Sequence, residues 1–279
     1  MKIGILADCF GLDFHQSIVK AAELGADGVQ IYAVEGPVSP ENMNAAARKE
    51  ASRYVKDHGL EISAICGDLG WGGFAFADRN PEKIARTKQI VDLALDMDCR
   101  IITTHIGVVP HNPAHPRFEV IAKALTELGA YAADKGARFA IETGPELAED
   151  LRRMIDFVAS PGIGVNLDPA NLVMSVKGDP VKSVETLAPY IVHTHAKDGI
   201  FKKWCDPDVG YGMVEAPEDY NEWDYCLETP LGEGQVDFDT YIPALKKAGY
   251  DGYLTIEREV GDDPAADIAM AIGFLKKYL

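Results

Sequence analysis

Eight short runs of apolar, mostly β-branched residues recur along this chain of 279 residues, and segments with helical periodicity separate them. Strands that are buried on both faces of a parallel sheet read as such near-continuous apolar runs. Eight strand–helix units favour closure into one (β/α)8 TIM barrel spanning residues 1–279 over an open doubly wound sheet. The runs cover residues 2–7, 28–33, 62–69, 100–107, 138–144, 163–169, 191–198 and 252–259.

Proline and glycine mark the expected helix boundaries. The dipeptides Ser39-Pro40, Asn80-Pro81 and Asp263-Pro264 each place a capping residue before a proline that suits the first helical turn. Residues 24–28 (Leu-Gly-Ala-Asp-Gly) and 248–252 (Ala-Gly-Tyr-Asp-Gly) nearly repeat each other, and their first glycine suits the left-handed conformation that ends a helix. This repetition of one strand–helix unit supports the closed barrel.

The net charge excludes several classes of partner. The chain has 44 acidic and 27 basic residues, which gives −17 at pH 7. Such a field repels phosphate backbones and anionic lipid, so we expect neither nucleic acid nor a membrane as partner. Because no apolar run reaches the length of a membrane span and the N-terminus lacks a signal-peptide layout, we expect a cytoplasmic protein.

One connection breaks the regular spacing of the units. The residues from Gly199 to Gln235, which follow the seventh run, are rich in Trp, Tyr, Asp and Pro. Connections of this length inside compact domains are usually active-site lids or binding loops. We therefore expect a lid-like insertion at about 199–236, with an unstructured surface loop as the alternative.

Polar residues end the last four apolar runs, where the active site of such a barrel lies. Glu142 ends the fifth run, Asp168 the sixth and Glu257 the eighth, and His195 lies near the end of the seventh. A buried carboxylate is costly unless something pairs with it, and a divalent cation pairs with all three. Three carboxylates and one imidazole suit Mn²⁺ first, with Mg²⁺, Co²⁺ or Zn²⁺ as alternatives. Salt bridges or backbone amides could instead hold each carboxylate separately.

These segments resemble the sugar isomerases and epimerases with a xylose-isomerase-like barrel, a family that includes ketose 3-epimerases, inosose dehydratases and hydroxypyruvate isomerase. The resemblance implies that Glu142, Asp168, His195 and Glu257 bind the metal, and that Glu142 and Glu257 move a proton on opposite faces of the substrate. It also leaves a homo-oligomer possible. The most specific matches are residues 141–142 (Ile-Glu), 166–172 (Asn-Leu-Asp-Pro-Ala-Asn-Leu), 193–198 (His-Thr-His-Ala-Lys-Asp), 231–234 (Leu-Gly-Glu-Gly) and 249–258 (Gly-Tyr-Asp-Gly-Tyr-Leu-Thr-Ile-Glu-Arg).

Three departures separate the chain from the ketose 3-epimerases. Those enzymes commonly have a His where this chain has Asn171, a Glu where it has Ala148 and an Arg where it has Phe201. The substrate contacts are therefore expected to differ while the metal centre is retained. We expect His105, Asn171, Lys197, Cys66 and Trp71 to contact a sugar, and the lack of a glycine-rich phosphate loop favours one without phosphate.

The expected reaction is isomerisation or epimerisation of a keto sugar. A cation that chelates the carbonyl and a neighbouring hydroxyl stabilises the cis-enediolate formed when an adjacent C–H proton leaves. The alternative is a dehydratase or lyase, in which the same step precedes loss of a group β to the ketone. An abasic-site endonuclease shares the barrel but needs a His-rich zinc centre and a basic face, and a binding protein that has lost its chemistry would not need all four ligands.

Overall fold

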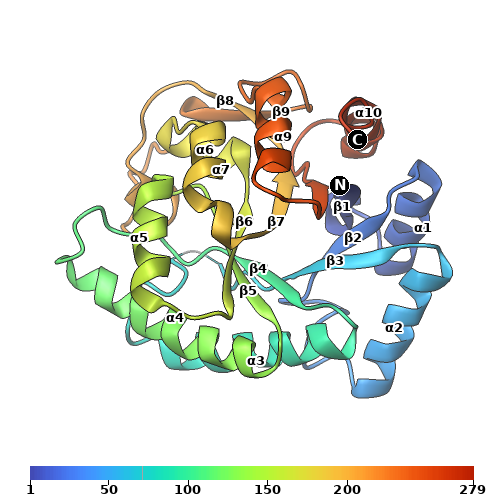
Figure 1. Ribbon diagram of the computed structural model, residues 1–279, viewed down its shortest axis with the longest axis horizontal. Coiled ribbons are helices and arrows are strands. Elements are labelled where there is room, and N and C mark those ends of the chain that lie inside the picture. Colours follow the sequence, from blue (N-terminus) through green and yellow to red (C-terminus); the bar gives the residue numbers. More distant parts are fainter. Residues whose placement is uncertain (71) are drawn as a thin grey trace.

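The computed structural model describes residues 1–70 and 72–279. Within them, eight parallel strands close into a barrel in the order β1-β10-β7-β6-β5-β4-β3-β2, with helices around it (Figure 1). This confirms the barrel predicted from the eight apolar runs. The barrel strands are β1 (Lys2–Leu6), β2 (Gly28–Tyr32), β3 (Glu61–Cys66), β4 (Ile101–Thr104), β5 (Arg138–Glu142), β6 (Ile163–Leu167), β7 (Ile191–Ala196) and β10 (Tyr253–Ile256).

Ten α-helices and three 3-10 helices occur in the described part of the chain. None of these helices is long and apolar enough to cross a membrane. The α-helices are α1 (Phe14–Leu24), α2 (Ala45–Asp57), α3 (Asn80–Asp96), α4 (Pro116–Asp134), α5 (Ala148–Val158), α6 (Pro169–Val176), α7 (Pro180–Leu187), α8 (Pro207–Gly210), α9 (Phe238–Lys247) and α10 (Pro264–Leu275), and the 3-10 helices are η1 (Ala7–Phe10), η2 (Ala188–Tyr190) and η3 (Glu222–Asp224).

Strand register sets the level of the candidate site within the barrel. Glu142 of β5 is the register partner of Asn166 in β6, and Asn166 in turn is the partner of His193 in β7. His195, two residues further along β7, is the partner of Thr255 in β10. Because side chains alternate along a strand, His193 and His195 point the same way, and the site extends along the barrel axis from one to the other.

The insertion after β7 is folded rather than unstructured. It contains the antiparallel pair β8 (Asp198–Phe201) and β9 (Cys226–Thr229), with α8 and η3 between them, and β8 packs beside α6. Asp198 holds its base, because the two carboxylate oxygens accept the backbone N–H groups of Gly199, Gly232, Gly234 and Val236 at 2.8–3.0 Å. The β8–β9 sheet is therefore fixed to the carboxyl-terminal end of β7.

Candidate metal centre

Four buried side chains converge at the carboxyl-terminal ends of adjacent strands. Each of Glu142, Asp168, His195 and Glu257 offers one ligand atom, and these four atoms lie within 4.8 Å of one another. Glu142 ends β5, His195 lies in β7, and Glu257 directly follows β10. Asp168 is the N-cap of α6 and accepts the backbone N–H of Asn171 at 2.8 Å, so the start of the helix fixes its carboxylate. The four predicted ligands are thus brought together.

One nitrogen of His195 faces all three carboxylates. Its Nδ1 lies 3.2 Å from Oδ2 of Asp168, 3.3 Å from Oε2 of Glu257 and 3.4 Å from Oε1 of Glu142. Burial lowers the pKa of His195, but the negative charge of these carboxylates outweighs burial and raises it well above its usual value. The same concentration of negative charge favours a divalent cation.

The other nitrogen of His195 lies near two amide groups. Nε2 is 3.0 Å from Oε1 of Gln30 and 3.2 Å from Nδ2 of Asn166. The amide nitrogen of Gln30 donates to Thr103 at 3.1 Å, so the Gln30 oxygen faces the ring. When Nε2 carries the hydrogen and donates it to Gln30, Nδ1 is left with a lone pair directed at the three carboxylates. Three oxygens and one such nitrogen fit a hard divalent cation such as Mn²⁺.

Amide groups hold Glu142. Its Oε2 accepts from Asn166 at 3.1 Å and its Oε1 from Asn171 at 3.0 Å. Burial raises the pKa of Glu142, but the positive charges of His195 and His105 outweigh it and lower the pKa below the usual value. His193 donates from Nδ1 to Asn166 and accepts at Nε2 from Thr255, both at 2.9 Å, and burial keeps its pKa well below the usual value. A neutral His193 therefore orients the amide that holds Glu142.

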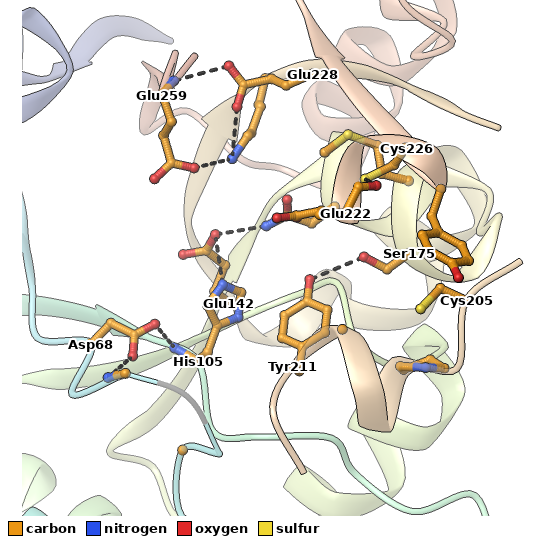
Figure 2. Close-up of a pocket in the computed structure, with 18 of the residues that line it drawn as sticks. Asp68, His105, Glu142, Ser175, Cys205, Tyr211, Glu222, Cys226, Glu228 and Glu259 are labelled. Carbon is orange, nitrogen blue, oxygen red and sulfur yellow. Dashed lines mark hydrogen bonds and ion pairs between the residues drawn. The ribbon is translucent and has the colours of Figure 1, made fainter. Parts of the chain in front are cut away.

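Lys197 holds Glu257. Its ammonium lies 2.9 Å from Glu257, 2.8 Å from Glu259 and 3.5 Å from Glu228. Figure 2 shows Glu259 beside Glu228, whose carboxylate accepts the backbone N–H of Glu259. Burial lowers the pKa of Lys197, but these three carboxylates raise it well above its usual value. Glu228 belongs to β9 of the insertion and also binds Arg258 at 2.8 Å. The insertion therefore contributes one carboxylate to the network around the candidate ligands.

A cavity of about 460 Å³ opens onto this cluster. Four of the five predicted substrate contacts line it, namely His105, Asn171, Lys197 and Cys66, whereas Trp71 lies outside the described residues. His105 Nε2 is 3.6 Å from Oε1 of Glu142. Burial raises the pKa of Cys66 well above its usual value, so its thiol forms an uncharged wall. The substrate roles of these residues stay predictions.

The two carboxylates that join Glu257 around Lys197 were not anticipated from the sequence. Glu259 follows Glu257 by two residues, and the period-two alternation of an extended chain could have indicated that it faces the same way. Glu228 carries no such signal, because it reaches the site through the antiparallel pairing of β8 and β9. The two strands lie in an irregular insertion, and no sequence pattern indicated that they pair or in which register.

Comparison with known proteins decides the family. Residues 18–278 match the family model of the xylose isomerase-like TIM barrel. The chain belongs to this family. A solved structure from it, the xylose isomerase domain protein of Planctomyces limnophilus, is 26% identical with a TM-score of 0.81, and the match covers 99% of this chain and 96% of that one. D-psicose 3-epimerase shares the fold with a TM-score of 0.73 at 15% identity, over 100% and 99% of the two chains.

The curated relatives of this chain include a decarboxylase and a dehydratase. The 3-oxo-isoapionate decarboxylase of Pectobacterium atrosepticum is 26% identical over 234 residues, 81% of this chain and 70% of that enzyme. The inosose dehydratase of Clostridium perfringens is 26% identical over 152 residues, 53% of this chain and about half (48%) of the dehydratase. The uncharacterized protein MJ1311 of Methanocaldococcus jannaschii is 24% identical over 226 residues, 73% and 68% of the two chains. The relatives and structural neighbours thus include both epimerases and dehydratases.

Proposed function

We propose that this xylose-isomerase-like barrel is an isomerase or epimerase of a keto sugar that works with one divalent cation, Mn²⁺ in the first instance. The observation that carries the proposal is the set of four buried ligand atoms within 4.8 Å of one another beside a cavity of about 460 Å³. A site of that volume takes a small molecule. Glu142, Asp168, His195 and Glu257 would hold the cation.

The proposed mechanism assigns proton transfer to the two glutamates. The cation, when bound, supplies the positive charge that polarises the ketone and offsets the charge on its oxygen. Glu142 or Glu257 removes a proton from the carbon next to the carbonyl, and the electrons of the broken C–H bond form the double bond of an enediolate. Return of a proton to the opposite face of that carbon inverts it, whereas return to the former carbonyl carbon moves the carbonyl instead.

The surroundings of the two glutamates support different duties. Asn166 and Asn171 hold the Glu142 carboxylate by neutral amides, whereas the Lys197 ammonium holds Glu257. Burial raises the pKa of Glu257, but His195 and Lys197 outweigh burial and keep it well below the usual value. Glu142 is accordingly assigned to the first proton abstraction, with Glu257 on the other face.

Lys197 also favours a second candidate, a lyase. Its ammonium lines the cavity beside Glu257 and could bind an oxygen that leaves from the carbon β to the ketone. In that reaction the C–H bond breaks as before, and the enediolate electrons expel the leaving group, which departs with a proton as an alcohol or water. The relation to inosose dehydratase supports this candidate at the level of the family.

The deciding experiment is proton NMR in D₂O with Mn²⁺-loaded protein and a panel of ketopentoses, ketohexoses, inosose and 3-keto-glucosides. We expect deuterium to enter one carbon next to a carbonyl, and the same exchange to disappear in Glu142→Gln. Glu23→Gln, an exposed position on α1, is the matched control and should exchange like the wild type.

The products separate the two candidates. Deuterium in a recovered epimer or isomer supports the isomerase, whereas an enone or a released alcohol supports the lyase. If no ketone in the panel exchanges although the protein binds Mn²⁺ stoichiometrically, the proposed proton abstraction on these substrates is wrong.

A further inference from the structure

The cavity is larger than one sugar ring requires. Its volume is about 460 Å³. A hexose has twelve heavy atoms, and each takes less room than a water molecule with its share of about 30 Å³, so the whole sugar needs less than about 360 Å³. Beside the strand ends, α6 and the insertion supply part of the wall, through residues such as Met174, Cys205 and Cys226. We call the part of the cavity lined by strand-end residues such as Glu142 and Glu257 the inner part, and the part lined by residues of the insertion the outer part. In Figure 2, Tyr211 lies between His105 and Cys205.

The charges on the cavity wall oppose an anionic substrate. Among the described lining residues, the basic ones are Lys197 and His105. The Lys197 ammonium already faces three carboxylates, so their negative charge outweighs its own before any phosphate approaches. The lining carboxylates are Asp68, Glu142, Asp206, Glu222, Glu228, Glu257 and Glu259. An approaching phosphate or carboxylate would meet this negative field, and a divalent cation in the inner part would offset only part of it.

The outer part is rich in aromatic rings. Tyr220, Trp223 and Tyr225, all from the insertion, line it. Tyr220 and Tyr225 stack with their ring centroids 5.5 Å apart and their planes inclined by 25°, which holds both rings in place. Trp223 keeps 44% of its surface exposed. Flat rings with a free face suit the apolar face of a second sugar or an aryl group.

We infer that the substrate is an uncharged keto glycoside, with its ketone-bearing ring in the inner part and its second ring, sugar or aryl, against Tyr220 and Trp223 in the outer part. This rests on the proposed function and adds the substrate class to it. The volume leaves room for the second ring, the lining carboxylates disfavour a negative charge, and the insertion supplies the ring contacts. A free ketose would leave the outer part filled with water.

The test compares a glycoside series that differs only beyond the first ring. Equilibrium binding of methyl, phenyl and glucosyl β-D-glucosides, which cannot react, is measured beside kcat/KM for the corresponding 3-keto compounds. We expect phenyl and glucosyl glycosides to bind about tenfold more tightly than the methyl glycoside because they bury an additional ring. Glucose 6-phosphate should bind more weakly than the methyl glycoside.

Variants locate the second ring. In the double variant Tyr220→Ala with Trp223→Ala, the ratio of phenyl to methyl affinity should fall to about one. The single variant Tyr220→Phe keeps both rings and should have the wild-type ratio. Trp204→Ala is the matched control, because Trp204 belongs to the same insertion but is 61% exposed and is absent from the described cavity wall. The ratio is measured within each variant, so an overall loss of stability does not imitate the effect.

The outcomes separate this inference from the proposed function. Equal kcat/KM for free ketoses and glycosides, or tighter binding of the phosphate, overturns the inference while deuterium exchange still supports the isomerase. A tenfold ratio that Tyr220→Ala with Trp223→Ala abolishes supports the outer binding part even if no ketone exchanges deuterium. In that case the proposed reaction fails and the binding preference stands.

Discussion

Gln30 Oε1 lies 3.0 Å from Nε2 of His195, so a side chain of β2 fixes a side chain of β7 across the interior of the barrel. Gln30 is itself only 1% exposed. When Nε2 carries the hydrogen, it donates to Gln30, and Nδ1 is left with a lone pair that faces the three carboxylates. The binding of a cation at the carboxyl-terminal end of the barrel therefore depends on Gln30, which contacts the predicted ligand His195.

Replacing Gln30 tests that dependence. Gln30→Met keeps the size of the side chain but removes the oxygen that accepts from His195, so we expect Mn²⁺ affinity to fall by about 10- to 100-fold. Titration followed by the electron paramagnetic resonance of free Mn²⁺ measures the affinity. Gln16→Met, at an exposed position on α1, is the control. Equal affinities in the two variants would show that Gln30 does not orient the ligand.

Removing the cation should lower thermal stability. A cation that binds the folded state alone contributes about 2.7 kcal/mol at a hundredfold excess over Kd, which corresponds to about 5–10 °C in Tm for a chain of this size. Calorimetry before and after chelation measures this difference. In Asp168→Asn, which replaces one of the three carboxylates by a neutral amide, we expect most of the difference to disappear. A shift as large as that of the wild type would place the cation elsewhere.

Glu146 should make the stability of the barrel fall with rising pH. Burial raises the pKa of Glu146 to about 8, and its Oε2 accepts from the Val109 N–H at 3.1 Å while no described group pairs with Oε1. The folded state therefore holds a proton that the unfolded chain has lost above its ordinary pKa of 4.5. Its stabilising contribution is complete below pH 4.5 and declines as pH rises to about 8, by the order of 4 kcal/mol.

Glu146→Gln should remove this decline, since a neutral amide replaces the protonated acid. Urea unfolding at pH 5 and pH 8 measures the free energy of unfolding, and the difference between the two pH values should shrink relative to the wild type. Glu50→Gln, exposed on α2, serves as control and should keep the wild-type difference. An unchanged difference in Glu146→Gln would mean that Glu146 is ionised in the folded state at pH 5.

Asp198 should stabilise the base of the insertion. An Asp198→Asn amide keeps one oxygen acceptor but turns an NH₂ group toward N–H donors, so we expect the free energy of unfolding to fall by about 2–3 kcal/mol. Urea unfolding checks the value, and limited proteolysis should cut near Gly232 and Gly234 sooner than in the wild type. Asp237→Asn, an exposed neighbour without a side-chain cap, is the control. Equal unfolding free energies in both variants would contradict the anchoring role.

The sequence predicted the barrel and its four candidate ligands for one physical reason. Parallel strands that are buried on both faces must be apolar throughout, so a polar residue at the end of a run, such as Glu142 or Glu257, stands out against the run itself. Because the carboxyl ends of parallel strands lie at the same end of a barrel, the position of these residues along the barrel axis can be predicted without the strand register. The same rule cannot find Glu228, whose position depends on how an irregular insertion folds back.

Helix starts were predictable where the capping side chain had no competing partner. Asp263 accepts the backbone N–H of Ala266 and caps α10 as predicted. The cap predicted at Asn80 was wrong, because Asn80 is the first residue of α3 and its side-chain amide donates to the carbonyl of Phe74. The start predicted at Ser39-Pro40 was wrong. Ser39 donates its hydroxyl to the carbonyl of Gly36 and forms a turn, and α2 begins only at Ala45, after Asn44 has accepted two backbone N–H groups.

The division of the cavity between barrel and insertion has an evolutionary consequence. The strand ends supply the candidate ligands, whereas residues 199–236 supply most of the outer wall. New substrates could therefore arise by exchange of that segment between homologues while the reaction itself is inherited unchanged. Glu228 sets a condition on such chimeras, because a transplanted segment without a carboxylate at this position would leave Arg258 and Lys197 short of a counterion.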